Sequence, residues 1–242
     1  MYTYTPSKAF EQYAEIITAN NTRIENLKKM TKQLYKIFDQ AFTLDPEMTG
    51  KIIASFIMGT NENPEFSEKD AYDHFIKNHI CTKNLIGKSS KNDLANRFVE
   101  DYKNAFELSI KILVRLRWID DVIAKKPVDF KKGYFKFAGK IIQEFNNSSL
   151  NWTFMTKSLD RNLRNAASHL DFHYDERRSI YEGKIRDAKH EKIKLFSITP
   201  EEFLEKTLPN ATNIIQSFVA AGLILYMKQE VNLQKKALTL LE

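Results

Sequence analysis

The sequence predicts a mainly α-helical protein, an antiparallel helical bundle with a small β-hairpin in its C-terminal half. Three observations support this fold class. Glycine and proline are scarce, at 7 and 6 of 242 residues, whereas many-stranded sandwiches and barrels need turn residues at short intervals. Apolar residues recur at steps of three and four over long stretches. Only two short runs, Ser179–Arg186 and Lys192–Ser197, alternate apolar and polar residues as hairpin strands do.

The first half of the chain contains several stretches with helical periodicity. Apolar residues form one stripe from Ser7 to about Thr43, and Asp45-Pro46 with Gly50 marks a break. A second apolar helix is expected over Glu47–Met58, followed by a loop. A further helix should begin at Ser67-Glu68-Lys69-Asp70, which has the residue types of a capping box, and run through His79.

The second half contains the longest periodic stretch, from Asp93 to Lys126. Its apolar stripe is wide enough for a helix packed on two sides at the centre of a bundle, and Pro127 ends it. Another helix is expected over Gly133–Phe145. After the hairpin, Thr199-Pro200-Glu201-Glu202 has the order of an N-cap, a helix-starting proline and first-turn acids. A final long helix, broken near Pro209, should follow.

Composition limits the classes of protein to consider. Hydrophobic residues make up 43% and charged residues 28% of the chain, as in folded soluble proteins. The single cysteine excludes an internal disulfide and a cysteine-rich zinc site. Residues Met1–Phe10 lack the apolar core of a signal peptide, and the longest apolar run, Phe218–Met227, is too short to cross a bilayer as a helix. We therefore expect a cytoplasmic protein without a membrane segment.

The chain is basic, with a formal net charge of +6 and a pI of about 9.1. A positive surface attracts polyanions, so nucleic acid is a reasonable partner. Simple solubility explains the same charge equally well.

A polar cluster stands out in the stretch Trp152–His173, which the periodicity predicts as one helix. Asn165 and His169 fall on one flank of its apolar face. Arg164 falls on the opposite flank, about 140° from His169 on an ideal helix. One helix therefore cannot direct both side chains to one point easily. A second copy packed across a two-fold axis would bring the arginine of one chain to the histidine of the other.

These residue types suit the cleavage of RNA. The reaction begins when a ribose 2′-hydroxyl attacks the neighbouring phosphorus, and His169 can accept its proton because the ordinary histidine pKa lies near neutrality. Arg164 can bind the phosphoryl oxygens with a planar cation, and Asn165 can hold a phosphate oxygen or orient the imidazole. No metal or other cofactor is required, because the nucleophile belongs to the substrate. On residue types alone, however, a surface arginine and histidine without catalytic role are the commoner interpretation.

The run Leu163-Arg164-Asn165-Ala166-Ala167-Ser168-His169 resembles the signature of the HEPN superfamily, an arginine followed by a polar residue and, after four to six intervening residues, a histidine. The following residues, Ile185–Asp187, Lys192–Leu195 and Thr199–Phe203, resemble the hairpin and helix start that trail this motif in abortive-infection and toxin proteins of that class. The resemblance implies a helical bundle, a homodimer with the motif at its interface and, frequently, endoribonuclease activity in defence or toxin–antitoxin systems. It also assigns Arg164, Asn165 and His169 as catalytic.

The resemblance divides the chain at position 92. Residues 93–242 form the expected HEPN-like helical domain, and residues 1–92 form an N-terminal helical segment of unknown role. The expected partners are RNA, a second copy of the chain, and a cognate antitoxin or defence-system protein. Since the superfamily also contains non-cleaving members, a nucleotide-binding, RNA-binding or dimerisation module is the alternative function.

Secondary candidates surround the motif. Arg161, His173, Arg177 and Arg178 are the further residues expected to contact RNA. His169 and His173, four residues apart, could also share a metal ion, but the His-Glu-x-x-His pattern of such zinc sites is absent, so no metal ligands are assigned.

Overall fold

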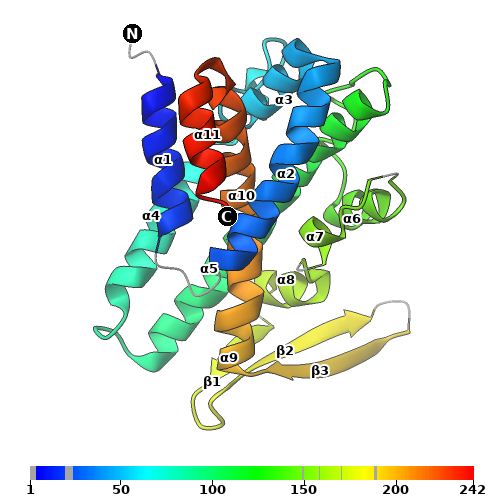
Figure 1. Cartoon of the computed structure of the whole chain (residues 1–242). Helices are drawn as coiled ribbons and strands as arrows, with labels where there is room; N and C mark the ends of the chain where they lie inside the picture. The colour runs from blue at the N-terminus through cyan, green and yellow to red at the C-terminus, as the bar shows by residue number, and fades with distance from the viewer. Residues whose placement is uncertain (1–3, 20–23, 149, 158, 170, 188–189) are drawn as a thin grey trace.

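The computed structural model describes residues 4–19, 24–148, 150–157, 159–169, 171–187 and 190–242. It confirms the mainly helical fold with a small antiparallel sheet (Figure 1). The helices of the bundle are α1 (Pro6–Thr18), α2 (Ile24–Leu44), α3 (Pro46–Met58), α4 (Lys69–Leu85), α5 (Lys91–Ile123), α6 (Ala138–Asn146), α10 (Leu208–Tyr226) and α11 (Val231–Thr239). The shorter elements are η1 (Pro64–Phe66), α7 (Thr153–Thr156), α8 (Arg161–Ser168), α9 (Pro200–Glu202), a π-helical turn η2 (Phe203–Thr207) and η3 (Met227–Gln229).

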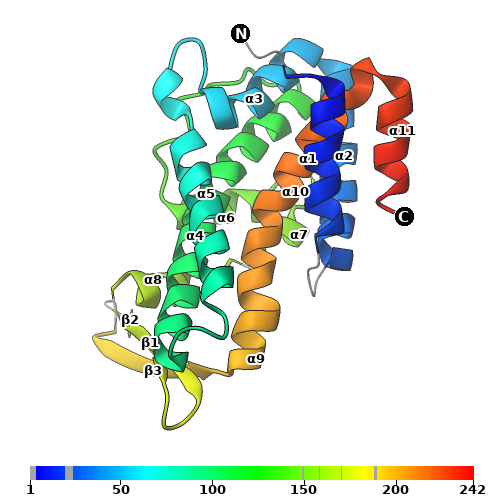
Figure 2. The ribbon, with the colours of Figure 1, turned by 90° about the vertical axis from the view of Figure 1, so that its left-hand side faces the viewer.

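Helix α5 is the central element of the bundle, as the wide apolar stripe predicts. It begins where the Ser90 side chain accepts a hydrogen bond from the Asp93 backbone amide, 3.1 Å away. Its 33 residues contact α2, α3, α4, α6, α8 and α10. Figure 2 shows α5 running along most of the length of the bundle between α4 and α10. The elements at both ends of the molecule are therefore attached to one long helix.

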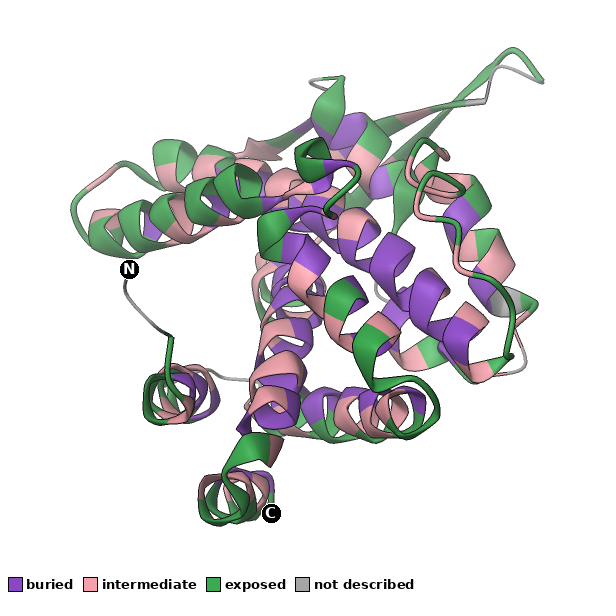
Figure 3. Ribbon diagram, turned by 90° about the horizontal axis from the view of Figure 1, so that it is seen from above, coloured by how far each residue is buried: buried purple, intermediate pink, exposed green. Residues whose placement is uncertain are grey.

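The stretch Pro200–Gln229 is the second long apolar element. Thr199 caps it as predicted, since its side chain accepts a hydrogen bond from the Glu202 amide at 3.1 Å. By length and composition alone this stretch could cross a membrane, but 72% of its apolar window is buried inside the fold. That is the position of a core helix in a soluble protein, and Figure 3 shows how much of the bundle interior is buried.

The core joins the two halves of the chain. The larger hydrophobic cluster extends from Met30 to Leu225, and a smaller one packs α1 against α10 and α11. In the smaller cluster the buried Tyr13 hydroxyl donates a hydrogen bond to the Ala237 carbonyl, at 2.7 Å. Both clusters combine residues of the segment 1–92 with residues of 93–242.

The sheet lies at one end of the bundle, below α8 in the view of Figure 1. Its order is β1–β2–β3 and both pairs are antiparallel. The strands are β1 (Phe172–Asp175), β2 (Ile180–Asp187) and β3 (Lys192–Ile198). The predicted hairpin is thus confirmed as β2–β3, and β1 adds a strand to it.

One glycine permits the aromatic packing of the sheet. Gly183 pairs with Phe172 on one side and Phe196 on the other, and the two phenylalanine rings stack with centroids 5.7 Å apart. A Cβ at this position would collide with the Phe196 ring. The buried rings of Tyr181 and Phe203 pack against the same cluster and attach the sheet to the bundle.

The prediction of one helix over Trp152–His173 is wrong. The stretch divides into α7, α8 and strand β1. A new helix begins at Arg161 because the Asp160 carboxylate accepts hydrogen bonds from two backbone amides, at 2.8 and 3.1 Å. The helix ends at Ser168, and Phe172 instead enters the sheet and its aromatic cluster.

Other boundaries also differ from the predictions. The capping box expected at Ser67–Asp70 does not form, because Glu68 is the N-cap of α4 and makes no side-chain cap hydrogen bond, and α4 runs to Leu85 and not only through His79. The stripe from Ser7 to Thr43 is two helices, α1 and α2, with residues 20–23 outside the described part of the chain. Gly50 lies inside α3 and does not break it. The helix expected from Gly133 begins only at Ala138, because Gly133 adopts a φ of 102° that turns the chain.

Candidate functional site

Helix α8 is a short, firmly packed element that carries Arg164 and Asn165, and His169 follows directly after it. Leu163, Ala166 and Ala167 are buried, and the helix contacts α5, β1 and β2. The other side of the helix remains accessible, since Arg161, Asn165 and Ser168 are exposed. The apolar side therefore fixes the helix while polar side chains stay at the surface.

Arg164 is held by a carboxylate from the central helix. Its Nε and Nη2 donate to Glu107 Oε1, and its Nη1 donates to Asn165 Oδ1 at 3.1 Å. The side chains of Arg164 and Glu107 are 32% and 46% exposed, so solvent reaches both. One edge of the guanidinium is thus occupied by Glu107, while one N–H on Nη1 and one on Nη2 have no partner among the described residues.

His169 lies directly after the helix. It is the C-cap residue, its backbone amide donates to the Asn165 carbonyl at 3.0 Å, and its φ is −97°. The residue is exposed, and its imidazole makes no hydrogen bond or ion pair with any residue that the structure describes. The ring is therefore available to a ligand.

The secondary candidates separate into two groups. Arg161 lies on α8, and its guanidinium covers Gly139 at the start of α6, where a Cβ would collide with it. His173 lies on β1, opposite Glu182 in the register, and is exposed. It does not share a helix with His169, so the spacing of four that suggested a shared metal ion does not place both rings on one helical face.

Arg177 and Arg178 lie in the turn that joins β1 to β2, at the end of β1 that is remote from α8 in chain order. Asp175 Oδ1 accepts hydrogen bonds from both of their backbone amides, at 2.9 and 3.2 Å. The Arg178 side chain forms an ion pair with Glu182. These two arginines are consequently displaced along the sheet from the motif residues.

Glu107 is the residue that sequence reasoning missed. A signal for it exists, because polar residues recur at steps of three and four beside the apolar stripe of α5, namely Asp101, Asn104, Glu107, Lys111 and Arg115. This stripe faces α4, and a small cavity of about 140 Å³ lies there, lined by Glu68, Ala71, His74, Asn104, Glu107, Leu108 and Lys111. Glu107 thus connects Arg164 to the polar side of the central helix.

No three histidine, cysteine, aspartate or glutamate side chains gather as a metal site within the described ranges. The candidate site therefore consists of Arg164 oriented by a carboxylate, the adjacent Asn165 amide and the exposed imidazole of His169. Comparisons of the chain with protein-family models, with curated proteins and with solved structures give no match.

Proposed function

We propose that the protein is a metal-independent endoribonuclease of the HEPN type, in which Arg164, Asn165 and His169 act on a phosphodiester. The strongest support for this proposal is the difference in exposure between the two sides of α8. Its apolar side is buried, yet the imidazole of His169 is exposed and uncommitted while Arg164 is oriented beside Asn165. An accessible imidazole and an oriented guanidinium close to it in the chain are the groups that the proposed chemistry needs.

In the proposed reaction His169 accepts the proton of the ribose 2′-hydroxyl. The 2′-oxygen forms a bond to phosphorus, and the bond from phosphorus to the 5′-oxygen breaks. The leaving 5′-oxygen takes a proton from water, and the protonated His169 returns its proton to the hydroxide that forms. Arg164 and the Asn165 amide stabilise the charge on the phosphoryl oxygens. The products are a 2′,3′-cyclic phosphate end and a 5′-hydroxyl end.

Glu107 is the positioning residue in this scheme. It occupies the Nε and Nη2 side of the Arg164 guanidinium, and this contact leaves the outer edge, with one donor each on Nη1 and Nη2, for two phosphate oxygens. An arginine restrained in this way loses less side-chain freedom when the phosphate binds.

The reaction takes place in a homodimer. Arg164 is tied to α5 on its own chain, whereas His169 projects from the helix end, so a facing copy of α8 brings a histidine to each arginine. The proposed setting is the cytoplasm of a cell in which the enzyme acts as a toxin or a phage-defence effector, restrained by a cognate antitoxin or partner.

The test is cleavage of a fluorescent single-stranded RNA by purified protein in the presence of EDTA. We expect His169→Ala to reduce the rate at least about 100-fold, the lower end for loss of a general base, and Arg164→Ala to reduce it comparably. His190→Ala is the matched control, because His190 is also an exposed histidine but lies in the turn before β3. It should cleave at the wild-type rate.

Product analysis sharpens the result. A 2′,3′-cyclic phosphate should appear, and RNA with 2′-O-methyl groups should resist cleavage. Equal cleavage by wild type and His169→Ala would refute the proposal. Tight RNA or nucleotide binding without turnover by the wild type would support the non-catalytic alternative instead.

A further inference from the structure

The segment 124–140, which joins α5 to α6 and includes the first three residues of α6, carries a dense positive charge. It contains six lysines and one acid, Asp129. Asp129 Oδ1 accepts the backbone amides of Lys131 and Lys132, both at 3.0 Å. Lys136 pairs with Glu144 at 2.6 Å, whereas the remaining lysines are exposed and form no ion pair with described residues: Lys125, Lys126, Lys131, Lys132 and Lys140.

Two phenylalanines project from the same segment. Phe135 is 77% exposed and Phe137 is 89% exposed, the highest values for large apolar side chains in the part of the chain that is described. Exposure of two aromatic rings among lysines is unfavourable unless something covers them, because each ring leaves apolar area in water. The segment therefore has the composition of a binding surface.

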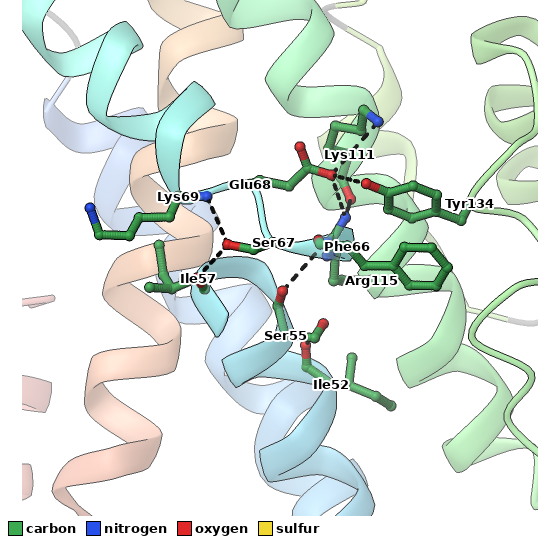
Figure 4. Close-up of polar contacts among 10 residues, drawn as sticks. All are labelled: Ile52, Ser55, Ile57, Phe66, Ser67, Glu68, Lys69, Lys111, Arg115 and Tyr134. Carbon is green, nitrogen blue, oxygen red and sulfur yellow. Dashed lines mark hydrogen bonds and ion pairs between the residues drawn. The ribbon is translucent and has the colours of Figure 1, made fainter. Parts of the chain in front are cut away.

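The segment is anchored to the bundle immediately before these rings (Figure 4). The Tyr134 ring stacks on Phe66 with centroids 3.9 Å apart, and its hydroxyl donates to Glu68 Oε1 at 3.0 Å. Glu68 in turn pairs with the fully buried Arg115 at 3.3 Å. The Phe135 ring rests edge-on against Tyr134, at 5.4 Å, while its outer side stays open.

A second anchor lies a few residues earlier. The Phe130 ring packs edge-on against the buried Trp118, with centroids 5.0 Å apart, and the Trp118 indole donates to the Lys132 carbonyl at 3.4 Å. Gly133, at a φ of 102°, then turns the chain between the two anchors. The exposed rings are thus presented on a restrained loop, which reduces the entropy lost on binding.

We propose that residues 125–140 form a platform that binds single-stranded RNA, with bases stacked on Phe135 and Phe137 and phosphates held by the surrounding lysines. Aromatic rings interleaved with lysines are the arrangement that proteins use for unpaired strands, since every base offers a flat apolar face. A membrane-surface element would instead carry its apolar residues along one side of an amphipathic helix, and these two rings lie in a loop before α6.

The platform adjoins the motif helix. Arg161, the first residue of α8, covers Gly139 with its guanidinium, and Gly139 lies two residues after Phe137. Figure 1 shows α6 and α8 on the same side of the bundle. One strand can therefore contact the platform and α8 together. As a substrate-binding surface the platform rests on the proposed function, but its affinity for RNA does not depend on cleavage.

The test uses the full chain and a fluorescein-labelled 2′-O-methyl oligouridine, which cannot be cleaved by attack of a 2′-hydroxyl, with binding followed by fluorescence anisotropy. We expect F135A/F137A to weaken binding at least about tenfold, since removal of one stacking ring corresponds to roughly 5- to 100-fold. Ile80 and Ile86 on and after α4 are also exposed, at 53% and 57%, so I80A/I86A is the matched control and should bind as the wild type does.

Charge reversal of the lysines tests the same platform independently of the two rings. K131E/K132E should weaken binding and lower the salt dependence by about 0.7 in log–log slope for each phosphate that the protein no longer neutralises. The control is K235E/K236E, an exposed lysine pair on α11 that makes the same change in net charge. It should weaken RNA binding less than K131E/K132E does. Circular dichroism confirms that each variant is folded.

Undiminished affinity in both platform variants would overturn the proposal. So would loss of binding to phosphatidylserine vesicles with unchanged RNA affinity, which would identify a membrane surface. The two proposals fail separately. Platform-dependent RNA binding by a wild type that cuts no RNA refutes the ribonuclease alone. A wild type that cuts RNA, with an F135A/F137A variant that binds the uncleavable RNA as tightly as the wild type, refutes the platform alone.

Discussion

Two arginine–glutamate pairs involve residues of α5 and differ in how far they are exposed to solvent. Arg115 and Glu68 have side chains 0% and 8% exposed, whereas Arg164 and Glu107 are 32% and 46% exposed. Both carboxylates border the same small cavity between α4 and α5. The two regions therefore share a helix and a polar stripe but differ in access to water.

The protein bonds Arg115 of the buried pair at both Nη atoms, whereas its Nε is buried without a hydrogen-bond partner among the described residues. Arg115 also donates to the carbonyls of Phe66, Ser55 and Lys111, and the ring of Trp118 lies 5.5 Å from its guanidinium carbon. Burial lowers the pKa of Arg115, and Glu68 opposes that shift. Because the side chain is 0% exposed, this guanidinium is closed to a ligand from solvent. The same residue pair is therefore structural where it is enclosed and available for chemistry where one edge stays open.

The largest expected effect is at the buried pair. Arg115→Ala should lower the free energy of unfolding by about 3–5 kcal/mol, because it removes the buried cation of Glu68 and leaves only the more distant, partly exposed Lys111 beside that carboxylate, at 3.7 Å. Urea denaturation measures this. Lys51→Ala on α3 is the control, because Lys51 and its partner Glu47 are 51% and 79% exposed, and it should lower the free energy of unfolding much less. Equal losses in the free energy of unfolding for the two variants would contradict the distinction between buried and open pairs.

A smaller effect is expected for Tyr134, which links the buried pair to the loop. Burial raises its pKa from the ordinary value of 10 to about 12. Because the folded pKa is the higher one, the hydroxyl's stabilisation is fully present below pH 10 and is lost as the pH rises toward 12. Tyr134→Phe should cost about 0.5–1.5 kcal/mol at pH 8, and the difference from wild type should shrink between about pH 10 and 12. Urea denaturation at each pH measures this. A difference in the free energy of unfolding that stayed constant across that range would contradict the prediction.

The smallest stability effect is expected at the open pair. A double-mutant cycle of Glu107→Gln and Arg164→Gln should give a coupling of about 1 kcal/mol or less, reduced further by salt. The proposed function adds a second readout, in which Glu107→Gln lowers kcat while the affinity for uncleavable RNA stays unchanged. A large coupling with unchanged kcat would make this pair structural like the buried one.

Much of the bundle was predictable from local sequence. The apolar stripes of α5 and the Pro200–Gln229 stretch, the N-cap at Thr199 and the β2–β3 hairpin follow from periodicity and residue types within each element. Apolar periodicity alone could not locate the end of α8. Phe172 continues after the helix as part of an alternating strand only because β2 is there to pair with it.

The candidate site was predictable only in part. Arg164, Asn165 and His169 could be named from the motif, and the structure places them on and at the end of one short helix. Glu107 could not be assigned to Arg164, because 57 residues separate them. The exposed rings of Phe135 and Phe137 were likewise hidden in a stretch that periodicity predicted as helix.

The sequence by itself determined most of the long helices and which residues form the motif, because helical hydrogen bonds and apolar periodicity act over three or four residues. Tertiary structure alone decided which arginine is enclosed, which carboxylate orients the other, and which aromatic rings stay exposed. Those outcomes depend on contacts such as Tyr134 to Glu68, 66 residues apart, that form only once the bundle has packed.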